Sequence, residues 1–409
     1  MQEAERCLQD WAPELTRTAQ ANHQKVLVAF QAERVSAYHF HGTTGYGLSD
    51  VGRDVLDQVT ARILGTEAAL VRSQFVSGTH ALAAVLFGIL RPGDHLLSGT
   101  GFPYDTLEEV IGMRGQGLGS LRDFGVAFDT VPLQSDGALD CAQIVRKIRP
   151  NTRLVMLQRS CGYTWRPSLT IARLQEGVRY LKERFPELNI LVDNCYGELV
   201  ETREPGDIGV DIMAGSLIKN LGGSLAPTGA YVAGRQDLVQ LAAARLTAPG
   251  IGGAVGATLD HLRLYFQGLY MSPLTVAQAL QGALFAAAFW QALGYEVHPQ
   301  PREARTDLIQ AIKLGSREQM IVFCQGIQQG SPIDAYVKPE PAPMPGYEDD
   351  VIMAGGTFIQ GSTSEFSADG PLREPYIVYQ QGGISYAYTR IGHILAAMNL
   401  YEKGLLLGG

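Results

Sequence analysis

The sequence lacks the features that mark several common classes of protein. Its 409 residues include only five cysteines, which are scattered and form no C-x-x-C pair, so neither a disulfide framework nor a cysteine metal site is expected. No basic tract is present and the net charge is −8, which argues against a nucleic-acid partner. None of the eight histidines lies in a metal-ligand pattern. This cysteine usage favours a reducing, cytoplasmic location.

Long apolar runs and targeting signals are also missing. The most apolar stretch, 279–293, is interrupted by glutamines and is shorter than the ~20 residues that span a membrane, so it predicts a buried helix. The first residues are charged rather than apolar, so no signal peptide is expected. No G-x-G-x-x-G follows the early strands, which argues against a Rossmann dehydrogenase. We therefore expect no membrane partner and no dinucleotide chemistry.

What is present is the composition of a well-packed α/β protein, with 46% apolar and 18% charged residues. The length favours two domains. Strand and helix patterns alternate from residue 54 onward, which predicts a mostly parallel sheet with helices on both faces. A smaller α+β unit follows. The expected division is a helical arm over 1–45, a large domain over 46–270, and a small C-terminal domain with its connecting helices over 271–409.

The expected elements follow from apolar periodicity. Residues 1–37 are predicted to be mostly helical, and this segment either packs on a partner subunit or lies on its own domain. Two helices are expected after the glycine-rich passage 247–256. The other expected elements are helices over 55–64, 169–185 and 391–400, and strands over 69–75, 95–98, 153–158, 190–193, 212–214, 230–233, 320–324 and 351–359.

Two motifs carry the strongest chemical signal. Asp193 ends an apolar strand in L-V-D-N-C-Y, and Lys219 follows one crossover later in G-S-L-I-K-N-L-G-G. An imine-forming lysine and an acid that holds a pyridinium nitrogen are the two fixed needs of pyridoxal phosphate (PLP) chemistry. Small and apolar neighbours predict a half-buried Lys219 whose pKa falls toward ~7–8. A surface lysine and an Asx turn at Asp193 are the alternatives.

Further candidates surround this pair. Ser77, Gly78 and Thr79 follow a strand and open a helix, where backbone N–H groups bind a phosphate, although the same residues also suit an ordinary N-cap. Ser216, three positions before the lysine, is a second phosphate ligand candidate. Tyr104 lies just past a strand and is a candidate to stack on the cofactor and to pass protons. A tyrosine packed over a turn is the alternative there.

Two more sets of residues are candidates for anion binding. Tyr46 and Arg53 lie in or beside a glycine-rich loop and are candidates to reach a phosphate, including that of a neighbouring subunit. Arg373 and Arg390 are candidates for the carboxylate of an amino-acid substrate, because arginine binds carboxylates bidentately. Arg373 is preferred because prolines flank it. Solvated surface arginines and an aromatic loop anchor are the alternatives.

The motifs D-N-C-Y, S-L-I-K-N-L-G-G and S-G-T resemble those of the fold-type-I PLP enzymes of the cystathionine lyase and methionine γ-lyase class. G-Y-G-L-S-D-V-G-R-D, P-Y-D-T-L-E-E-V-I-G and F-S-A-D-G-P-L-R-E-P-Y resemble the aluminium-resistance, or methionine γ-lyase-like, branch. The resemblance implies a PLP-dependent transferase-like α/β fold. It also implies an imine at Lys219, a pyridinium contact at Asp193, phosphate contacts at Ser77, Gly78, Thr79 and Ser216, and ring stacking by Tyr104. Ile218 stands where those lyases carry a hydroxyl residue.

The resemblance further implies a function. The expected protein is a PLP-dependent carbon–sulfur lyase that acts on a sulfur-containing amino acid, such as cystathionine or methionine, by β- or γ-elimination. A homo-oligomer, built as a dimer of dimers with shared active sites, is implied by the same analogy. An aminotransferase or aldolase of the same fold, and a PLP-binding protein without turnover, are the alternatives. The physiological substrate and any link to metal tolerance stay open.

Overall fold

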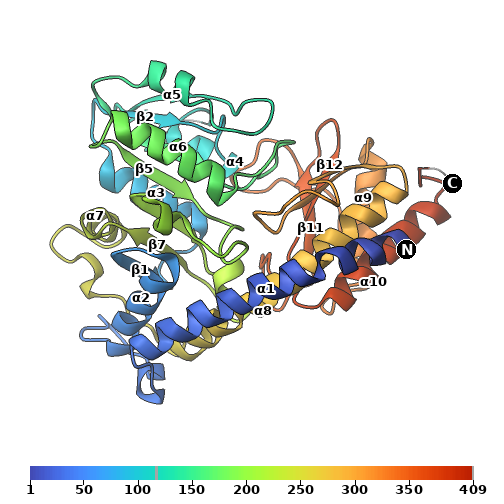
Figure 1. Cartoon of the computed structure of the whole chain (residues 1–409), viewed down its shortest axis with the longest axis horizontal. Helices are drawn as coiled ribbons and strands as arrows, with labels where there is room; N and C mark the ends of the chain where they lie inside the picture. Colours follow the sequence, from blue (N-terminus) through green and yellow to red (C-terminus); the bar gives the residue numbers. More distant parts are fainter. Residues whose placement is uncertain (116–117, 408–409) are drawn as a thin grey trace.

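The computed structural model describes residues 1–115 and 118–407, and it consists of a large and a small unit joined by two long helices (Figure 1). These helices, α1 (Gln2–Ala32) and α8 (Leu262–Ala292), lie side by side and run from one unit to the other. The expected boundary between 270 and 271 therefore falls inside α8. Two helices were predicted after the glycine-rich passage. The structure instead has one continuous helix, α8, which contains Pro273 in its interior.

The large unit is built on a seven-stranded sheet. β7 is antiparallel to both of its neighbours, and the other neighbouring strands are parallel, so the predicted mostly parallel sheet is confirmed. In spatial order the strands are β1 (Ala68–Arg72), β7 (Ala230–Gly234), β6 (Ile212–Ser216), β5 (Asn189–Asp193), β4 (Thr152–Gln158), β2 (His95–Ser98) and β3 (Ala127–Thr130). The central strands are largely apolar because helices cover both faces of the sheet.

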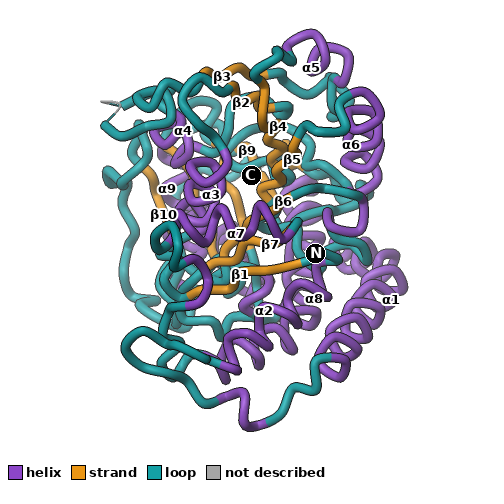
Figure 2. The backbone as a smooth tube through the Cα atoms, turned by 90° about the vertical axis from the view of Figure 1, so that its left-hand side faces the viewer, coloured by secondary structure: helices purple, strands orange, loops and turns teal. Residues whose placement is uncertain are grey.

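Helices lie on both sides of this sheet (Figure 2). Besides α1 and α8, they are α2 (Val51–Leu64), α3 (Gly78–Ile89), α4 (Asp105–Ile111), α5 (Cys141–Lys147), α6 (Ile171–Arg184) and α7 (Gln236–Leu246). One apolar layer lies under α3, α4 and α7, and another lies under α1, α2, α5, α6 and α8. Short 3-10 turns occur at Ala37–Phe40, Pro205–Ile208, Asn220–Gly222 and Gly252–Ala254.

The small unit is a five-stranded antiparallel sheet with two helices packed against each other. Its strands in spatial order are β10 (Val351–Ala354), β11 (Ser367–Pro371), β12 (Ile377–Gln381), β9 (Gln310–Lys313) and β8 (Glu296–His298), and its helices are α9 (Arg317–Gln329) and α10 (Tyr386–Glu402). The strand predicted over 320–324 is wrong, since these residues lie in α9. Ser316 caps this helix by accepting a hydrogen bond from the Gln319 N–H, a start signal that the short apolar run obscured.

The N-terminal helix lies on its own chain. Trp11 Nε1 donates to the Pro301 carbonyl at 3.0 Å, and Asn22 Nδ2 donates to the Leu199 carbonyl at 2.7 Å. Because Pro301 lies in the small unit and Leu199 in the large one, α1 ties the two units together. Among the described residues, no helix has the length and apolar character needed to cross a membrane.

Gly268 of α8 and Gly222 of the turn that follows Lys219 lie in close contact. A Cβ atom at Gly268 would overlap the carbonyl oxygen of Gly222. We therefore expect Gly268→Ala to lower the free energy of unfolding by about 1–3 kcal/mol, because the backbone must shift to admit a methyl group. Chemical denaturation measures the change, and Gln267→Ala on the exposed side of the same helix is the matched control. Equal stability of the two variants would contradict this packing.

Candidate functional site

A cavity of about 610 Å³ lies at the carboxyl edge of the large sheet. Gln158, Asp193 and Ser216, the last residues of β4, β5 and β6, all line it. Residues of the small unit, including those at 344–347 and in β11, form the opposing wall. Open α/β sheets bind ligands outside the carboxyl ends of their strands, so this cavity lies where the fold favours a site.

Lys219 and Asp193 meet in this cavity. Lys219 directly follows the Ser216–Ile218 segment, and its Nζ lies 3.9 Å from the centre of the Tyr196 ring. Asp193 Oδ1 accepts a hydrogen bond from the Cys195 N–H at 3.1 Å, which orients the carboxyl group at the end of β5. The sequence pattern predicted that these two side chains come together, and the strand ends that carry them are neighbours in the sheet.

The electrostatics of the pair differ from the sequence prediction in one respect. Burial raises the pKa of Asp193, although the Lys219 charge opposes this effect. Burial disfavours the charged form of Lys219, but Cys195, Tyr196 and Asp193 outweigh it, so the pKa of Lys219 lies above its ordinary value. The predicted lowering toward ~7–8 rested on the apolar neighbours of the lysine. It is wrong for this structure, because the acidic groups come from other segments of the chain.

The predicted phosphate residues lie together at another part of the same cavity. Ser77 caps α3 by accepting from the His80 N–H at 3.1 Å, so this helix directs its N-terminus at the cavity. A Cβ atom at Gly78 would lie 3.4 Å from both Cys195 Sγ and the Cβ of Ser216, so glycine leaves room there. Thr79 Oγ1 hydrogen-bonds Thr106 Oγ1 at 2.7 Å. The helix N-terminus and the hydroxyl groups form a cradle suited to a dianion.

Aromatic side chains form a further part of the wall. Tyr104 and Tyr347 share a hydrogen bond between their phenol oxygens at 2.7 Å. The ring of Tyr163 lies 5.4 Å from that of Tyr104 and 5.9 Å from that of Tyr347, measured between centroids. Burial raises the pKa of Tyr104 well above its usual range, so this phenol keeps its proton at neutral pH. The cavity thus combines an amine, two carboxyl groups (Asp193 and Asp369) and several phenols.

Three of these residues were not predicted from the sequence. Tyr163 lies in the loop just after β4, and a position beyond the carboxyl end of a parallel strand was a usable signal. Tyr347 lies in a proline-rich loop and has no pattern that points to a site. Asp369 belongs to the F-S-A-D-G-P-L-R-E-P-Y segment, which contributed to the resemblance but was not assigned a role.

The structure does not bring the predicted arginines or Tyr46 into the cavity. Tyr46 is 80% exposed on its loop. Arg53 is buried, and its Nη1 donates hydrogen bonds to the carbonyls of Gly47 and Gly256. It therefore holds the loop that carries Tyr46 against the segment around Gly256. These partners are backbone groups of remote segments, which the local sequence did not reveal.

The two small-unit arginines are each engaged by acids. Arg373 Nη1 pairs with Asp349 at 3.2 Å and with Asp105 at 3.4 Å, and it does not line the cavity. Arg390 Nε pairs with Glu5 of α1 at 3.1 Å, at the end of the molecule where α10 meets the N-terminus. Neither arginine is among the described residues that line the cavity.

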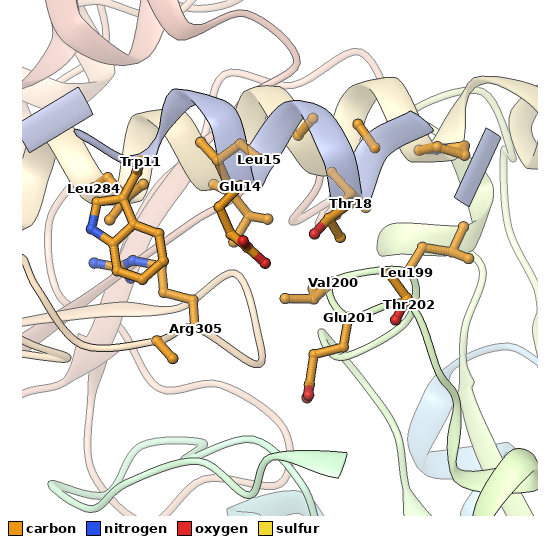
Figure 3. Close-up of a pocket in the computed structure, with 16 residues that line it drawn as sticks. Trp11, Glu14, Leu15, Thr18, Leu199, Val200, Glu201, Thr202, Leu284 and Arg305 are labelled. Atoms are coloured by element: carbon orange, nitrogen blue, oxygen red, sulfur yellow. The ribbon is translucent and has the colours of Figure 1, made fainter. Parts of the chain in front are cut away.

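A second cavity of about 250 Å³ lies between α1, α8 and the loop after β5 (Figure 3). Glu14 and Thr18 project from α1 toward Val200 and Glu201 of that loop, and Trp11 lies beside Arg305. None of the predicted site residues lines this cavity. Its walls are built from the helices that join the two units, so it is a feature of their packing.

The larger cavity fits the cofactor that the sequence resemblance implies. PLP needs an amine for its aldehyde, an anion for its ring nitrogen and a cradle for its phosphate. Lys219, Asp193 and the Ser77–Thr79 turn supply these three needs within one cavity. The missing side chain at Gly78 leaves the space that a phosphate requires.

Comparison with known proteins agrees with this geometry. The family model described as Methionine gamma-lyase matches residues 1–401. Protein YnbB of Bacillus subtilis, described as uncharacterized, is 48% identical over 394 residues, which are 96% of this chain and 94% of YnbB.

Solved structures are similar over nearly the whole chain. A Listeria monocytogenes protein described as a candidate cystathionine beta-lyase involved in aluminium resistance is 50% identical, with a TM-score of 0.94, and the match covers 97% of this chain and 98% of that one. A carbon–sulfur lyase involved in aluminium resistance from Clostridium novyi is 46% identical, with a TM-score of 0.92 and coverage of 97% and 94%. The PLP-dependent protein YhfS of Escherichia coli is 17% identical with a TM-score of 0.63, and it confirms the predicted fold class.

Proposed function

The chain belongs to the methionine gamma-lyase family, and from this and the site we propose that it is a PLP-dependent carbon–sulfur lyase. Its substrates would be sulfur-containing amino acids of the cystathionine or methionine type, cleaved by β- or γ-elimination. The observation that carries the proposal is the convergence of Lys219, Asp193 and the Ser77–Thr79 turn on one cavity. Family membership implies a lyase and implies PLP.

The residues of the cavity have separable roles toward the cofactor. When bound, PLP supplies an electron sink that stabilises negative charge at the α-carbon of the substrate. Lys219 would hold it covalently through Nζ, and Asp193 would pair with its ring nitrogen. Ser77, Gly78, Thr79 and Ser216 would hold its phosphate, and Tyr104 would stack on its ring.

The chain also supplies the proton transfers of elimination. With a substrate in place, the free amine of Lys219 would take the proton from the substrate α-carbon. As the carbon–sulfur bond breaks with its electron pair going to sulfur, Tyr104 or Lys219 would give a proton to that sulfur. The phenol of Tyr104 carries its proton at neutral pH, because burial raises its pKa. Acid–base assistance of this kind contributes about 10²–10⁴ in rate.

Incubation with L-cystathionine or L-methionine tests the proposal. A lyase releases a keto acid, ammonia and a thiol without an amino acceptor. Keto acid that forms only when an acceptor is added would instead identify an aminotransferase, and aldehyde release from a β-hydroxy amino acid would identify an aldolase. A protein that binds PLP but converts none of these compounds would be the non-catalytic alternative.

We further propose that the protein is a cytoplasmic homo-oligomer, a dimer of dimers in which neighbouring subunits complete each other's sites. Two observations support a shared site. Among the described residues, no arginine lines the cavity, although a substrate carboxylate is best met by one. Tyr46 is 80% exposed on its loop, which suits a contact with a neighbouring subunit.

The phosphate cradle leads to a quantitative prediction. Ser216→Ala removes a hydroxyl group from the cavity wall, and we expect it to weaken PLP binding by about tenfold, because one hydrogen bond to a charged group is lost. Titration of the cofactor-free protein with PLP, followed by absorbance, gives the dissociation constant. Ser120→Ala is the matched control, since Ser120 is a buried serine outside the cavity. A Ser216→Ala variant with unchanged affinity would contradict the assigned contact.

A further inference from the structure

The charge of the cavity is unusual for a site that binds an amino acid. Among the described residues that line it, Lys219 is the single cationic side chain, whereas Asp193 and Asp369 are both carboxylic acids. The proposed function commits Lys219 and Asp193 to the cofactor. Asp369 is therefore left without an assigned role, although it lines the same cavity.

Asp369 is held inside the cavity wall by neutral groups. It lies in the middle of β11 and is 3% exposed, and its Oδ1 accepts a hydrogen bond from Gln381 Nε2 at 2.8 Å. The nearby Arg373 does not neutralise it, because that guanidinium pairs with Asp105 and Asp349 instead. A buried carboxylate is costly unless a cation faces it, so this position favours a ligand that brings its own positive charge.

Aromatic rings flank this acid. Tyr163 and Tyr347 line the same cavity, and their centroids lie 5.9 Å apart at an interplanar angle of 45°. Tyr163 also packs against Tyr379 of β12, which fixes its orientation beside β11. Tyrosine faces attract an ammonium group, and a carboxylate beside them supplies the opposite charge. This combination attracts organic cations electrostatically, and a neutral alkyl group lacks that attraction.

We propose that Asp369, Tyr163 and Tyr347 form a cation subsite that selects substrates whose departing sulfur fragment carries a positive charge. The substrate class is amino acids in which the thiol leaving group bears an ammonium group. This inference rests on the proposed lyase function, because it assigns the subsite to the far side of the carbon–sulfur bond. With a neutral fragment, Lys219 would be the one cation that lines the described cavity beside Asp369, and the proposed function assigns that amine to the cofactor.

The subsite should respond to pH. Burial raises the pKa of Asp369 to about 7, against the opposing influence of Tyr163 and Lys219, which face it from the loops after β4 and β6. Gln381 on β12 also faces it, as do the Cys324 thiol on α9 and the phenols of Tyr347, Tyr104, Tyr196 and Tyr379. Burial raises the pKa of each of these thiol and phenol groups, so none of them is charged at neutral pH. Because the ionised carboxylate attracts the cation, preference for a cationic substrate rises between pH 6 and pH 8.

A pair of isosteric substrates tests the inference. S-(2-Aminoethyl)-L-cysteine and S-propyl-L-cysteine share the same carbon–sulfur bond and the same length, and they differ in one charge. We expect the wild-type holoenzyme at pH 8 to favour the aminoethyl compound in kcat/KM by at least about tenfold. Asp369→Asn brings this ratio to about one. Asp349→Asn, which removes an acid outside the cavity, keeps the wild-type ratio.

Binding without turnover separates this inference from the proposed function. The α-methyl derivatives of both compounds lack the proton that elimination removes, so calorimetry on the holoenzyme gives their dissociation constants directly. If neither parent compound is cleaved but the aminoethyl derivative binds at least about tenfold more tightly, the lyase proposal fails and the subsite stands. If the wild-type protein binds the two derivatives with equal affinity, the proposed subsite is wrong. This result holds whether or not the parent compounds are cleaved, and it does not depend on the folding of the Asp369→Asn variant.

Discussion

The Lys219→Ala variant is expected to lose carbon–sulfur cleavage by a factor of about 10⁴ or more. The variant loses both the covalent attachment of the cofactor and the group that moves the α-proton, and the second loss alone corresponds to about 10²–10⁴. Initial rates of keto acid release at saturating PLP measure the effect. The yellow absorbance of the attached cofactor should disappear in the same variant.

A lysine outside the cavity provides the matched control. Lys313 lies on β9 and pairs with Glu296 at the surface, so Lys313→Ala should keep both the absorbance and the rate. Rapid cleavage by Lys219→Ala would show that another amine carries the cofactor. Loss of activity in both variants would point to a general effect on folding rather than to chemistry at position 219.

The second large effect is expected from Asp193→Asn, which keeps the shape of the side chain and removes its charge. A charge-assisted hydrogen bond to the cofactor ring contributes about 1.5–3 kcal/mol, so kcat should fall about ten- to hundredfold. Asp237→Asn serves as the control, because Asp237 is exposed and pairs with Arg235. A kcat within twofold of the wild type would contradict the assigned contact. A twofold change corresponds to roughly 0.4 kcal/mol, which is the ordinary precision of such an assay.

This substitution should also change the pH profile. Burial raises the pKa of Asp193 in the folded protein, while Lys219 opposes the shift. The ionised carboxylate is the form that pairs with the ring nitrogen, so the wild-type rate falls as pH drops through that raised pKa. Asparagine does not titrate, and the acid limb due to this group should be absent in Asp193→Asn. Parallel kcat measurements from pH 5 to pH 9 on both proteins show whether the limb disappears.

Local patterns predicted the part of the site that one sheet builds. Asp193 ends one apolar strand and Lys219 follows the next, and parallel strands that are neighbours place their carboxyl ends side by side. The turn from Ser77 to Thr79 was recognisable because it opens a helix directly after a strand. These residues needed only the order of the elements, which alternation of strand and helix makes visible.

The rest of the site depends on contacts between remote segments. Asp369 and Tyr347 reach the cavity from the small unit, and nothing near them in the sequence indicates that approach. Arg390 looked free for a carboxylate, but its partner Glu5 comes from the opposite end of the chain. The run 320–324 looked like a strand because its residues are apolar, although the cap at Ser316 and burial on one side make it a helix. Charge pairing and helix burial are tertiary properties.

Borohydride reduction of the PLP-loaded wild-type protein, followed by proteolysis and mass spectrometry, tests the central claim most directly. Reduction fixes the attached cofactor as a stable pyridoxyl group on whichever amine carries it. The geometry of the cavity predicts that this group is found on the peptide that contains Lys219. A pyridoxyl group on a different lysine, or its absence from every peptide, would contradict the assignment of this cavity as the active site.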